Sequence, residues 1–206
     1  MLGLQKARAS LLGLRSSSAA ALASRNGLRH ASSVPSDKDN FKIVVVGAGA
    51  GGLTVANQIF NRFRSAGKAL SSDDIAILDA AEYHYYQPGW TLVGAGLKDK
   101  TSTRQPLKKV ISDNLVHIPE NVQSFSPESS SITTTSGRTI SYDSLVVATG
   151  LQTNWNNIPG LSQALIDPSS GVSSIYSYET CDKVWRDIDS LLSEAETPSS
   201  LNLQAL

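Results

Sequence analysis

The sequence predicts an α/β domain built around a parallel β-sheet. Residues 41–46 form a short, almost wholly apolar run, of the kind buried on both faces of a parallel sheet. A helical pattern follows over residues 53–63, and a second apolar strand is expected at 75–78, ending at Asp79. Strand, helix and strand together make a βαβ unit, and its two strands must be parallel.

The turn between the first strand and the helix has the spacing Gly47-x-Gly49-x-x-Gly52. In this motif the first glycine permits a tight turn, the second lets the backbone approach a pyrophosphate, and the third lets the helix pack against the strand. The free N–H groups at the helix N-terminus complete a phosphate site. The alternative is a flexible glycine turn without a ligand. The complete βαβ unit around the motif favours a dinucleotide-binding, Rossmann-like fold.

Asp79 stands where a carboxylate can accept hydrogen bonds from an adenosine ribose. Its separation from Gly52 is 79 − 52 = 27 positions, against about twenty in the usual motif, and a polar loop at 62–72 accounts for the excess. The alternative is an aspartate that only forms a turn. A ribose-binding acid suits an unphosphorylated 2′-hydroxyl, which permits FAD or NAD and disfavours NADP.

The pattern of residues 122–150 predicts a small three-stranded β-meander, followed by a buried strand that is closed by Thr149-Gly150. The expected strands are 122–125, 132–135, 139–141 and 145–148. Residues 80–110 and 151–176 are expected to be irregular, with a short helix at most near 106–111.

A last helix is expected from about residue 177, with apolar side chains along one stripe. These are Cys181, Val184, Trp185, Ile188, Leu191 and Leu192. Cys181 is the single cysteine of the chain, so an internal disulfide is excluded, and its place on the stripe predicts a packed core residue. The three histidines are too scattered to suggest a metal site, so no metal ligand is predicted. No catalytic residue is predicted either, because one thiol cannot cycle through an intramolecular disulfide.

Charge patterning separates the first residues from the rest. The chain has 18 basic and 18 acidic residues, a balance that does not suggest nucleic-acid binding. Residues 1–36 nevertheless contain five basic and no acidic residues, which predicts a mitochondrial transit peptide rather than a merely disordered terminus. Residues 37–40 are read as a linker. No apolar run approaches the roughly twenty residues of a transmembrane helix.

Two segments resemble a known class of flavoprotein. The meander and the strand ending in residues 141–150, SYDSLVVATG, resemble the FAD domain of the glutathione reductase-like class, which favours FAD over NAD. The string HYYQPGWTLVGAG at 84–96 narrows the likeness to eukaryotic mitochondrial sulfide:quinone oxidoreductase. This resemblance runs from about residue 41 to 186. It implies FAD as cofactor, hydrogen sulfide and ubiquinone as partners, and a peripheral location on the matrix side of the mitochondrial inner membrane.

The resemblance also implies which residues meet the cofactor. FAD is expected to meet Ala50 and Gly51 at its pyrophosphate and Asp79 at its ribose. Gly47, Gly49 and Gly52 shape the turn that holds the cofactor. The positions that rest on resemblance alone are Gln87, Val122 and Gly150. Otherwise Gln87 is a polar loop residue and Val122 an ordinary strand residue. His84 and the aromatic residues near it either approach the flavin or simply pack over the domain.

The chain departs from this family pattern in its cysteines. The family uses two redox cysteines, and Cys181 matches neither. We therefore expect residues 41–176 to be the N-terminal part of an FAD-binding domain, and 177–206 to be a helix followed by an atypical, truncated tail. Such an incomplete chain is expected to be inactive alone. The alternatives are a non-catalytic remnant that binds FAD, and a type II NADH dehydrogenase-like flavoprotein.

Overall fold

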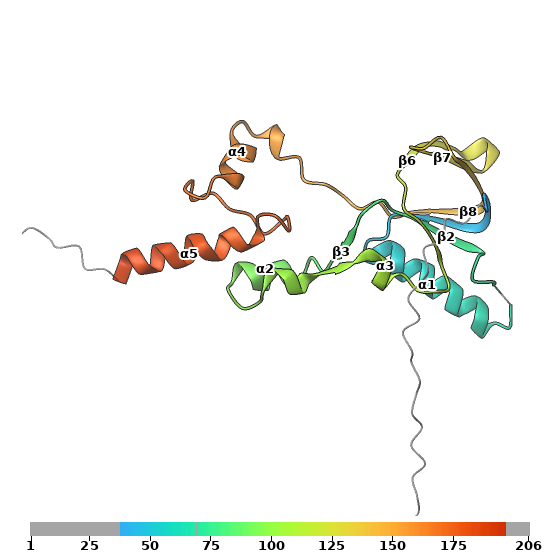
Figure 1. The fold of residues 1–206 in the computed structure, drawn as a ribbon, viewed down its shortest axis with the longest axis horizontal. Coiled ribbons are helices and arrows are strands. Elements are labelled where there is room, and N and C mark those ends of the chain that lie inside the picture. The colour runs from blue at the N-terminus through green and yellow to red at the C-terminus, as the bar shows by residue number, and fades with distance from the viewer. Residues whose placement is uncertain (1–37, 69, 197–206) are drawn as a thin grey trace, which may run out of the picture.

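The computed structural model describes residues 38–68 and 70–196, so the predicted transit peptide and the final ten residues lie outside the described part. The strands form one sheet in the order β5-β2-β1-β8-β7-β6 and a separate pair, β3-β4 (Figure 1). The strands are β1 Asn40–Val46, β2 Ile75–Leu78, β3 Tyr83–Tyr85, β4 Arg104–Pro106, β5 Val116–Ile118, β6 Val122–Ser126, β7 Ser131–Thr134 and β8 Thr139–Val147. The α-helices are α1 Ala50–Ser65, α2 Gly89–Gly94, α3 Leu107–Val110, α4 Leu161–Ile166 and α5 Cys181–Glu196.

The predicted βαβ unit is confirmed. Strand β1 pairs in parallel with β2 on one side and with β8 on the other, and β2 pairs in parallel with β5. The run of β-branched residues in β1 suits this central position, since Val44 and Val45 are both fully buried. The predicted α/β fold with a parallel sheet is therefore correct.

The parallel strands β1 and β2 lie between two layers. Ile43 and Val45 face one side, where they pack with Leu53, Ala56 and other residues of α1 and α3. On the other side lie Val44 and Val46, which pack in a second cluster with residues of the β6–β7–β8 meander such as Ile132 and Ile140. Figure 1 shows α1 below the parallel strands and the β6–β7 hairpin, which continues the same sheet, above them. Successive side chains of β1 thus point to opposite faces of the sheet and contribute to both hydrophobic clusters.

Several predicted boundaries are wrong. Residues 139–141 and 145–147 belong to one continuous strand, β8, and residue 148 lies just beyond its end. Helix α1 continues to Ser65, so the predicted loop at 62–72 starts later. The 80–110 region holds β3, β4 and α2, and 151–176 holds α4. These elements are three to six residues long, too short for a periodic pattern to show.

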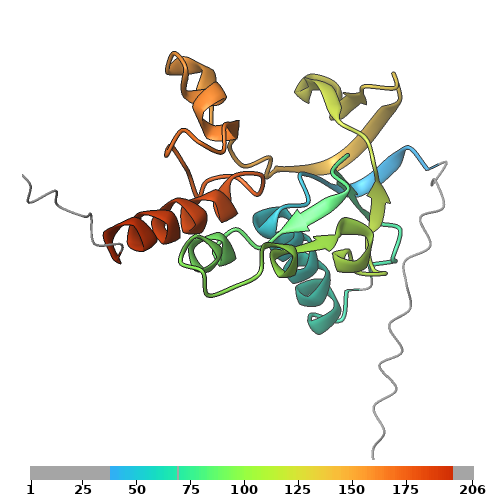
Figure 2. The same ribbon diagram turned by 60° about the vertical axis from the view of Figure 1, so that its left-hand side comes forward.

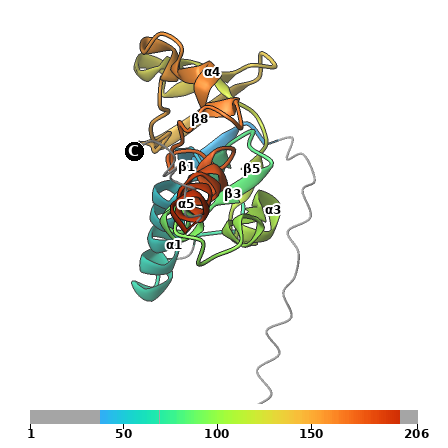
Figure 3. The same cartoon turned by 90° about the vertical axis from the view of Figure 1, so that its left-hand side faces the viewer.

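Helix α5 lies beside α2 and away from the sheet (Figure 2), and Figure 3 views α5 nearly along its axis, in front of the domain. At its start Cys181 is fully buried, which confirms the predicted core cysteine. The ring of Trp185 covers Gly96, where an added Cβ would lie 2.5 Å from the indole. The far end of the stripe is not packed, however, because Leu191 is 67% and Leu192 54% exposed. Within residues 38–68 and 70–196, no helix combines the length and apolar character of a membrane span.

Candidate dinucleotide site

The turn after β1 has the geometry that the glycine motif predicts. Gly47 adopts a left-handed φ of +99°, and its N–H donates to the carbonyl of Leu78 at 2.8 Å. A Cβ at Gly47 would lie 2.4 Å from the carbonyl oxygen of Ala148. Both the backbone angle and the close approach of another strand therefore require glycine.

Gly52 and Gly49 differ in what surrounds them. A Cβ at Gly52 would lie 1.8 Å from the carbonyl oxygen of Gly47, so the first turn of α1 can pack against β1 only without a side chain. At Gly49 and Gly51, by contrast, no atom lies within 4 Å of a built Cβ. The motif thus combines a tightly packed inner side with an open outer side at the N-terminus of α1, the arrangement that admits a phosphate.

Asp79 is joined directly to this turn. One carboxylate oxygen accepts a hydrogen bond from the backbone N–H of Ala48 at 2.7 Å, and the other accepts one from Ala81 at 2.8 Å. The residue is half-buried. A carboxylate has about four acceptor positions, so capacity for ribose hydroxyls remains after these two bonds.

Two histidines, to which the sequence assigned no contact with this turn, also meet the site. His84 places Nδ1 3.2 Å from the carbonyl oxygen of Ala48, and His117 places Nε2 3.0 Å from that of Asp79. Since a carbonyl only accepts, each of these ring nitrogens is the donor. The first contact fixes β3, and with it the HYYQP segment, against the glycine turn. Each contact joins residues more than thirty positions apart, so no local pattern in the sequence could have predicted it.

The site lies at the carboxyl ends of the parallel strands. Along the chain, β2 and then β5 are added on one side of β1, and β8 is added on the other side. In α/β sheets, such a change of side opens a crevice for ligands at the carboxyl ends of the strands. Ala148 donates to the carbonyl of Val46 at 2.8 Å, which holds the two strand ends together. Gly150 follows with a left-handed φ of +70°. The structure therefore gathers Gly47, Asp79 and Gly150 at neighbouring strand ends.

The other two predicted residues lie elsewhere. Gln87 follows β3 and lines a cavity of about 630 Å³ between α2 and the 151–180 segment. Val122 begins β6, opposite Thr134, and packs against the core on the meander side. The contacts of neither residue join it to the glycine turn, and their predicted roles toward FAD stay predictions.

The aromatic residues of the HYYQP region mostly pack against one another. The Tyr85 ring lies 6.0 Å from that of Trp90 and 5.0 Å from that of Tyr178, while Arg104 stacks over Tyr83 at 4.4 Å. Tyr86 is the exception, since 58% of it is exposed. Tyr83, Tyr85 and Trp90 therefore pack against other side chains, as the packing alternative expects, and shielding of a flavin stays a prediction.

Titration of the nearby groups is governed by burial. Burial raises the pKa of Tyr85, and the negative charge of Glu179 raises it further, while the charge of Arg104 and its hydrogen bond act in the opposite direction. Burial also raises the pKa of the Cys181 thiol, with a smaller contribution from Asp182. A buried thiol held in its protonated form is a poor nucleophile. In the part of the chain that the structure describes, no three His, Cys, Asp or Glu residues cluster as metal ligands would.

Comparison with known proteins agrees with this geometry. The family described as pyridine nucleotide-disulphide oxidoreductase matches residues 41–187. Mitochondrial sulfide:quinone oxidoreductase of Schizosaccharomyces pombe is 44% identical over 153 residues, which cover 70% of this chain and 33% of that protein. The Dictyostelium discoideum protein of the same name is 40% identical over 172 residues, covering 81% of this chain and 36% of that one.

A solved structure shares the fold. The sulfide:quinone oxidoreductase of the hyperthermophilic bacterium Aquifex aeolicus superposes with a TM-score of 0.55 at 24% identity, over 73% of this chain and 32% of that chain. The chain therefore spans about one third of the length of the relatives that it matches. The resemblance read from the sequence is confirmed.

Proposed function

The chain belongs to the pyridine nucleotide-disulphide oxidoreductase family, and from this premise we propose that residues 41–176 are the N-terminal part of the FAD-binding domain of a sulfide:quinone oxidoreductase. FAD fits the site on two counts. The outer side of the glycine turn is open at Gly49 and Gly51, and an acidic side chain at the end of β2 is fixed beside that turn. When bound, FAD supplies two-electron chemistry.

The observation that carries the proposal is the contact between Asp79 and Ala48. A hydrogen bond of 2.7 Å places the ribose-binding acid next to the pyrophosphate-binding turn, and ribose and pyrophosphate are adjacent in FAD. In this proposal the N–H groups of Ala50, Gly51 and Gly52 face the pyrophosphate, as the first N–H groups of α1 have no partner within the helix. Gly150 borders the ligand, while Gln87 and Val122 serve its more distant parts.

Substitution at Gly49 separates binding from folding. Gly49 has φ −68° and ψ −177°, an extended conformation that a β-branched residue also adopts, and a Cβ meets no atom within 4 Å. Gly49→Val is therefore expected to keep the unfolding temperature of the wild type. Its affinity for FAD should be at least about tenfold weaker, because the valine side chain occupies the phosphate position. Titration of FAD fluorescence against protein gives the affinity, and circular dichroism gives the unfolding temperature.

The matched control is Ser65→Val, at the exposed far end of the same helix. It should change neither quantity. Unchanged FAD affinity in Gly49→Val would reject the proposed site. We expect the wild-type affinity itself to be weak, because the assigned residues reach chiefly the ADP half of the cofactor. A stoichiometric yellow protein after gel filtration would contradict that expectation.

The proposed activity belongs to the longer relatives. Cys181 is the single cysteine and is fully buried, so this chain cannot cycle through an internal disulfide. We expect no sulfide-dependent reduction of decylubiquinone by the purified chain with added FAD. Turnover well above that of free FAD would show that this expectation is wrong.

Mitochondrial localisation is proposed from the acid-free start and from the names of the relatives; the proposed place is the matrix side of the inner membrane. Residues 1–36 fused to a fluorescent protein should accumulate in mitochondria. Replacement of Arg8, Arg15 and Arg25 by glutamate should leave the fusion in the cytosol, because import requires a basic, acid-poor segment. Equal distribution of the two fusions would reject the transit-peptide proposal.

A further inference from the structure

A second candidate site is the cavity of about 630 Å³ between α2 and the 151–180 segment. This volume is in the range of sites for small organic molecules, which are mostly apolar with a few placed polar groups. Its walls follow that description. The main apolar lining residues are Tyr85, Trp90, Trp155, Leu165, Ile175 and Tyr178.

One wall residue has an unsatisfied polar atom. Trp90 is only 7% exposed, and its indole N–H has no hydrogen-bond acceptor among the described residues. It is the one buried side-chain nitrogen or oxygen of the described chain in that condition. Since buried donors are nearly always paired, an orphan of this kind on a cavity wall indicates a missing acceptor.

The ring of Trp90 is held in place. It packs with Val93 and Cys181 and meets Tyr85 edge-on, with ring centres 6.0 Å apart. Tyr178 closes the same cluster, with its ring 5.0 Å from that of Tyr85. The indole N–H is sealed from solvent in this arrangement, so a ligand reaches it by displacing one of the rings beside it.

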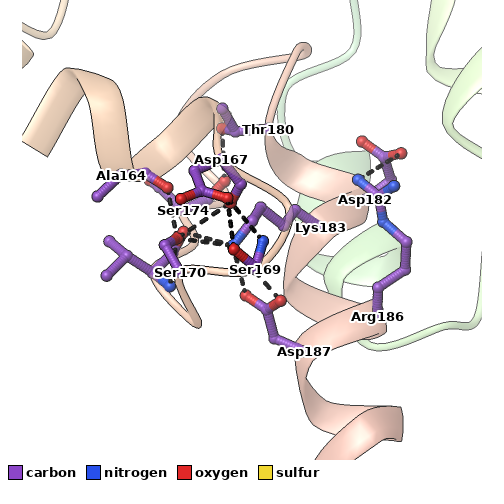
Figure 4. Close-up of polar contacts among 11 residues, drawn as sticks. Ala164, Asp167, Ser169, Ser170, Ser174, Thr180, Asp182, Lys183, Arg186 and Asp187 are labelled. Atoms are coloured by element: carbon purple, nitrogen blue, oxygen red, sulfur yellow. Dashed lines mark hydrogen bonds and ion pairs between the residues drawn. The ribbon is translucent and has the colours of Figure 1, made fainter.

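Polar contacts also hold the 167–180 segment, part of which lines the cavity (Figure 4). Lys183, on the first turn of α5, extends a nearly buried side chain that donates to the carbonyl of Val172 at 2.8 Å and pairs with Asp187 at 3.1 Å. Thr180 donates its hydroxyl proton to the carbonyl of Ser174 at 2.8 Å. These bonds fix the 167–180 segment, which has little regular structure of its own, against α5 and so preserve the shape of the cavity.

We propose that this cavity binds a planar ring that carries a carbonyl oxygen, and that Trp90 donates its indole N–H to that oxygen. The flat aromatic walls suit a ring, and the single orphan donor selects a ring with an acceptor on its edge. The inference rests on the proposed function, because both the isoalloxazine of FAD and the head group of a quinone have this chemistry. Trp90 acts here as a specificity-determining residue.

The first test uses two probes on the full chain, lumiflavin and decylubiquinone, titrated by calorimetry. At least one should bind saturably. Trp90→Phe keeps an apolar ring but removes the donor, so it should weaken that binding about tenfold, the usual value of one hydrogen bond from a buried donor. The matched control, Trp185→Phe, lies outside the cavity against Gly96 and should bind as wild type.

A second measurement does not depend on how Trp90→Phe folds. The chain has three tryptophans, so its indole N–H signals can be assigned in a proton–nitrogen NMR spectrum. Saturation with the bound probe should move the Trp90 indole proton downfield, as formation of a hydrogen bond requires, and leave that of Trp185 in place. A merely structural role of Trp90 predicts no such shift.

The outcomes distinguish a flavin ring from a quinone ring, and they distinguish failure of the cavity proposal from failure of the proposed function. Saturable binding of lumiflavin with the Trp90 shift supports a flavin ring, and the same result with decylubiquinone alone supports a quinone ring. Failure of both probes to saturate, or an unmoved Trp90 proton on saturation, overturns the cavity proposal. Loss of FAD affinity in Gly49→Val in the same protein would then still support the proposed function, so the two failures are distinguishable.

Discussion

Asp79 accepts a hydrogen bond from the backbone N–H of Ala48 at 2.7 Å, across 31 positions of sequence. The bond ties the end of β2 to the turn that follows β1. The two interpretations of Asp79, turn former and ribose ligand, are therefore not exclusive, since its other oxygen also caps the N–H of Ala81. The same carboxylate shapes the turn and keeps acceptor capacity for a ligand at the strand ends.

Removal of this carboxylate should destabilise the fold as well as weaken ligand binding. Asp79→Ala leaves the half-buried N–H of Ala48 without its acceptor, so the free energy of unfolding should fall by about 1–3 kcal/mol. Urea denaturation followed by circular dichroism measures this. The exposed Asp113 provides the control, because Asp113→Ala should stay within about 0.5 kcal/mol of wild type. Equal stability of both variants would show that the Ala48 contact is not structural.

Neighbouring glycines of the motif should respond to alanine with opposite signs. In Gly52→Ala the new Cβ meets the carbonyl oxygen of Gly47 at 1.8 Å, so the helix must move away from β1. We expect a loss of about 1–3 kcal/mol or more. In Gly51→Ala the Cβ meets nothing within 4 Å on helix α1, and stability should rise by about 0.4–1 kcal/mol. Thermal unfolding of the pair tests this, and a stable Gly52→Ala would refute it.

Lys183 should matter more than any exposed lysine. Its side chain is 5% exposed and that of its partner Asp187 is 17% exposed, so Lys183→Met leaves a largely buried carboxylate unpaired. We expect a loss of about 3–5 kcal/mol, with faster hydrogen exchange over residues 170–176. The double variant Lys183→Met/Asp187→Leu should recover part of this loss, and exposed Lys108→Met should show none. Identical exchange in Lys183→Met and wild type would contradict the proposed anchoring.

Asp74 should contribute to stability in a defined range of pH. Burial alone would raise the pKa of this carboxyl group, but hydrogen bonds from Lys42 and Ser71, with the charges of Lys42 and Lys38, outweigh burial and lower it. A carboxylate whose pKa is lower when folded stabilises the protein above its unfolded pKa of about 3.9. That contribution disappears as the pH falls through the folded pKa.

Asp74→Asn should therefore be less stable than wild type at pH 6, and the difference should shrink as the pH falls below about 4. Urea denaturation between pH 3 and 6 measures the difference. Exposed Asp143→Asn serves as the control for the loss of one charge. A difference between Asp74→Asn and wild type that does not change with pH would sink the prediction.

The sequence predicted those parts of the structure that depend on local pattern. The apolar run of β1, the glycine spacing and the acid after β2 placed Gly47, Gly52 and Asp79 correctly relative to one another. The β3–β4 pair was missed because each strand has three residues, too few to show alternation. These strands exist because distant segments pair.

The cavity could not be predicted for a related reason. Its walls come from residues near 85–91, 151–155 and 162–180, and no spacing rule connects such segments. The apolar stripe of α5 illustrates the opposite error. Periodicity indicates that Leu191 and Leu192 share a face, but it does not say whether another surface covers that face, and here both are exposed.

Gly47 rests against the carbonyl of Ala148, 148 − 47 = 101 residues further along. On the ribosome, a nascent chain that ends before residue 148 carries β1 and its glycines, but not yet the end of β8 that packs against Gly47. Closure of the turn is then a late event in synthesis, governed by the slow pairing of distant segments. Chaperones that meet the emerging chain before residue 148 would encounter the buried face of β1 still exposed to water.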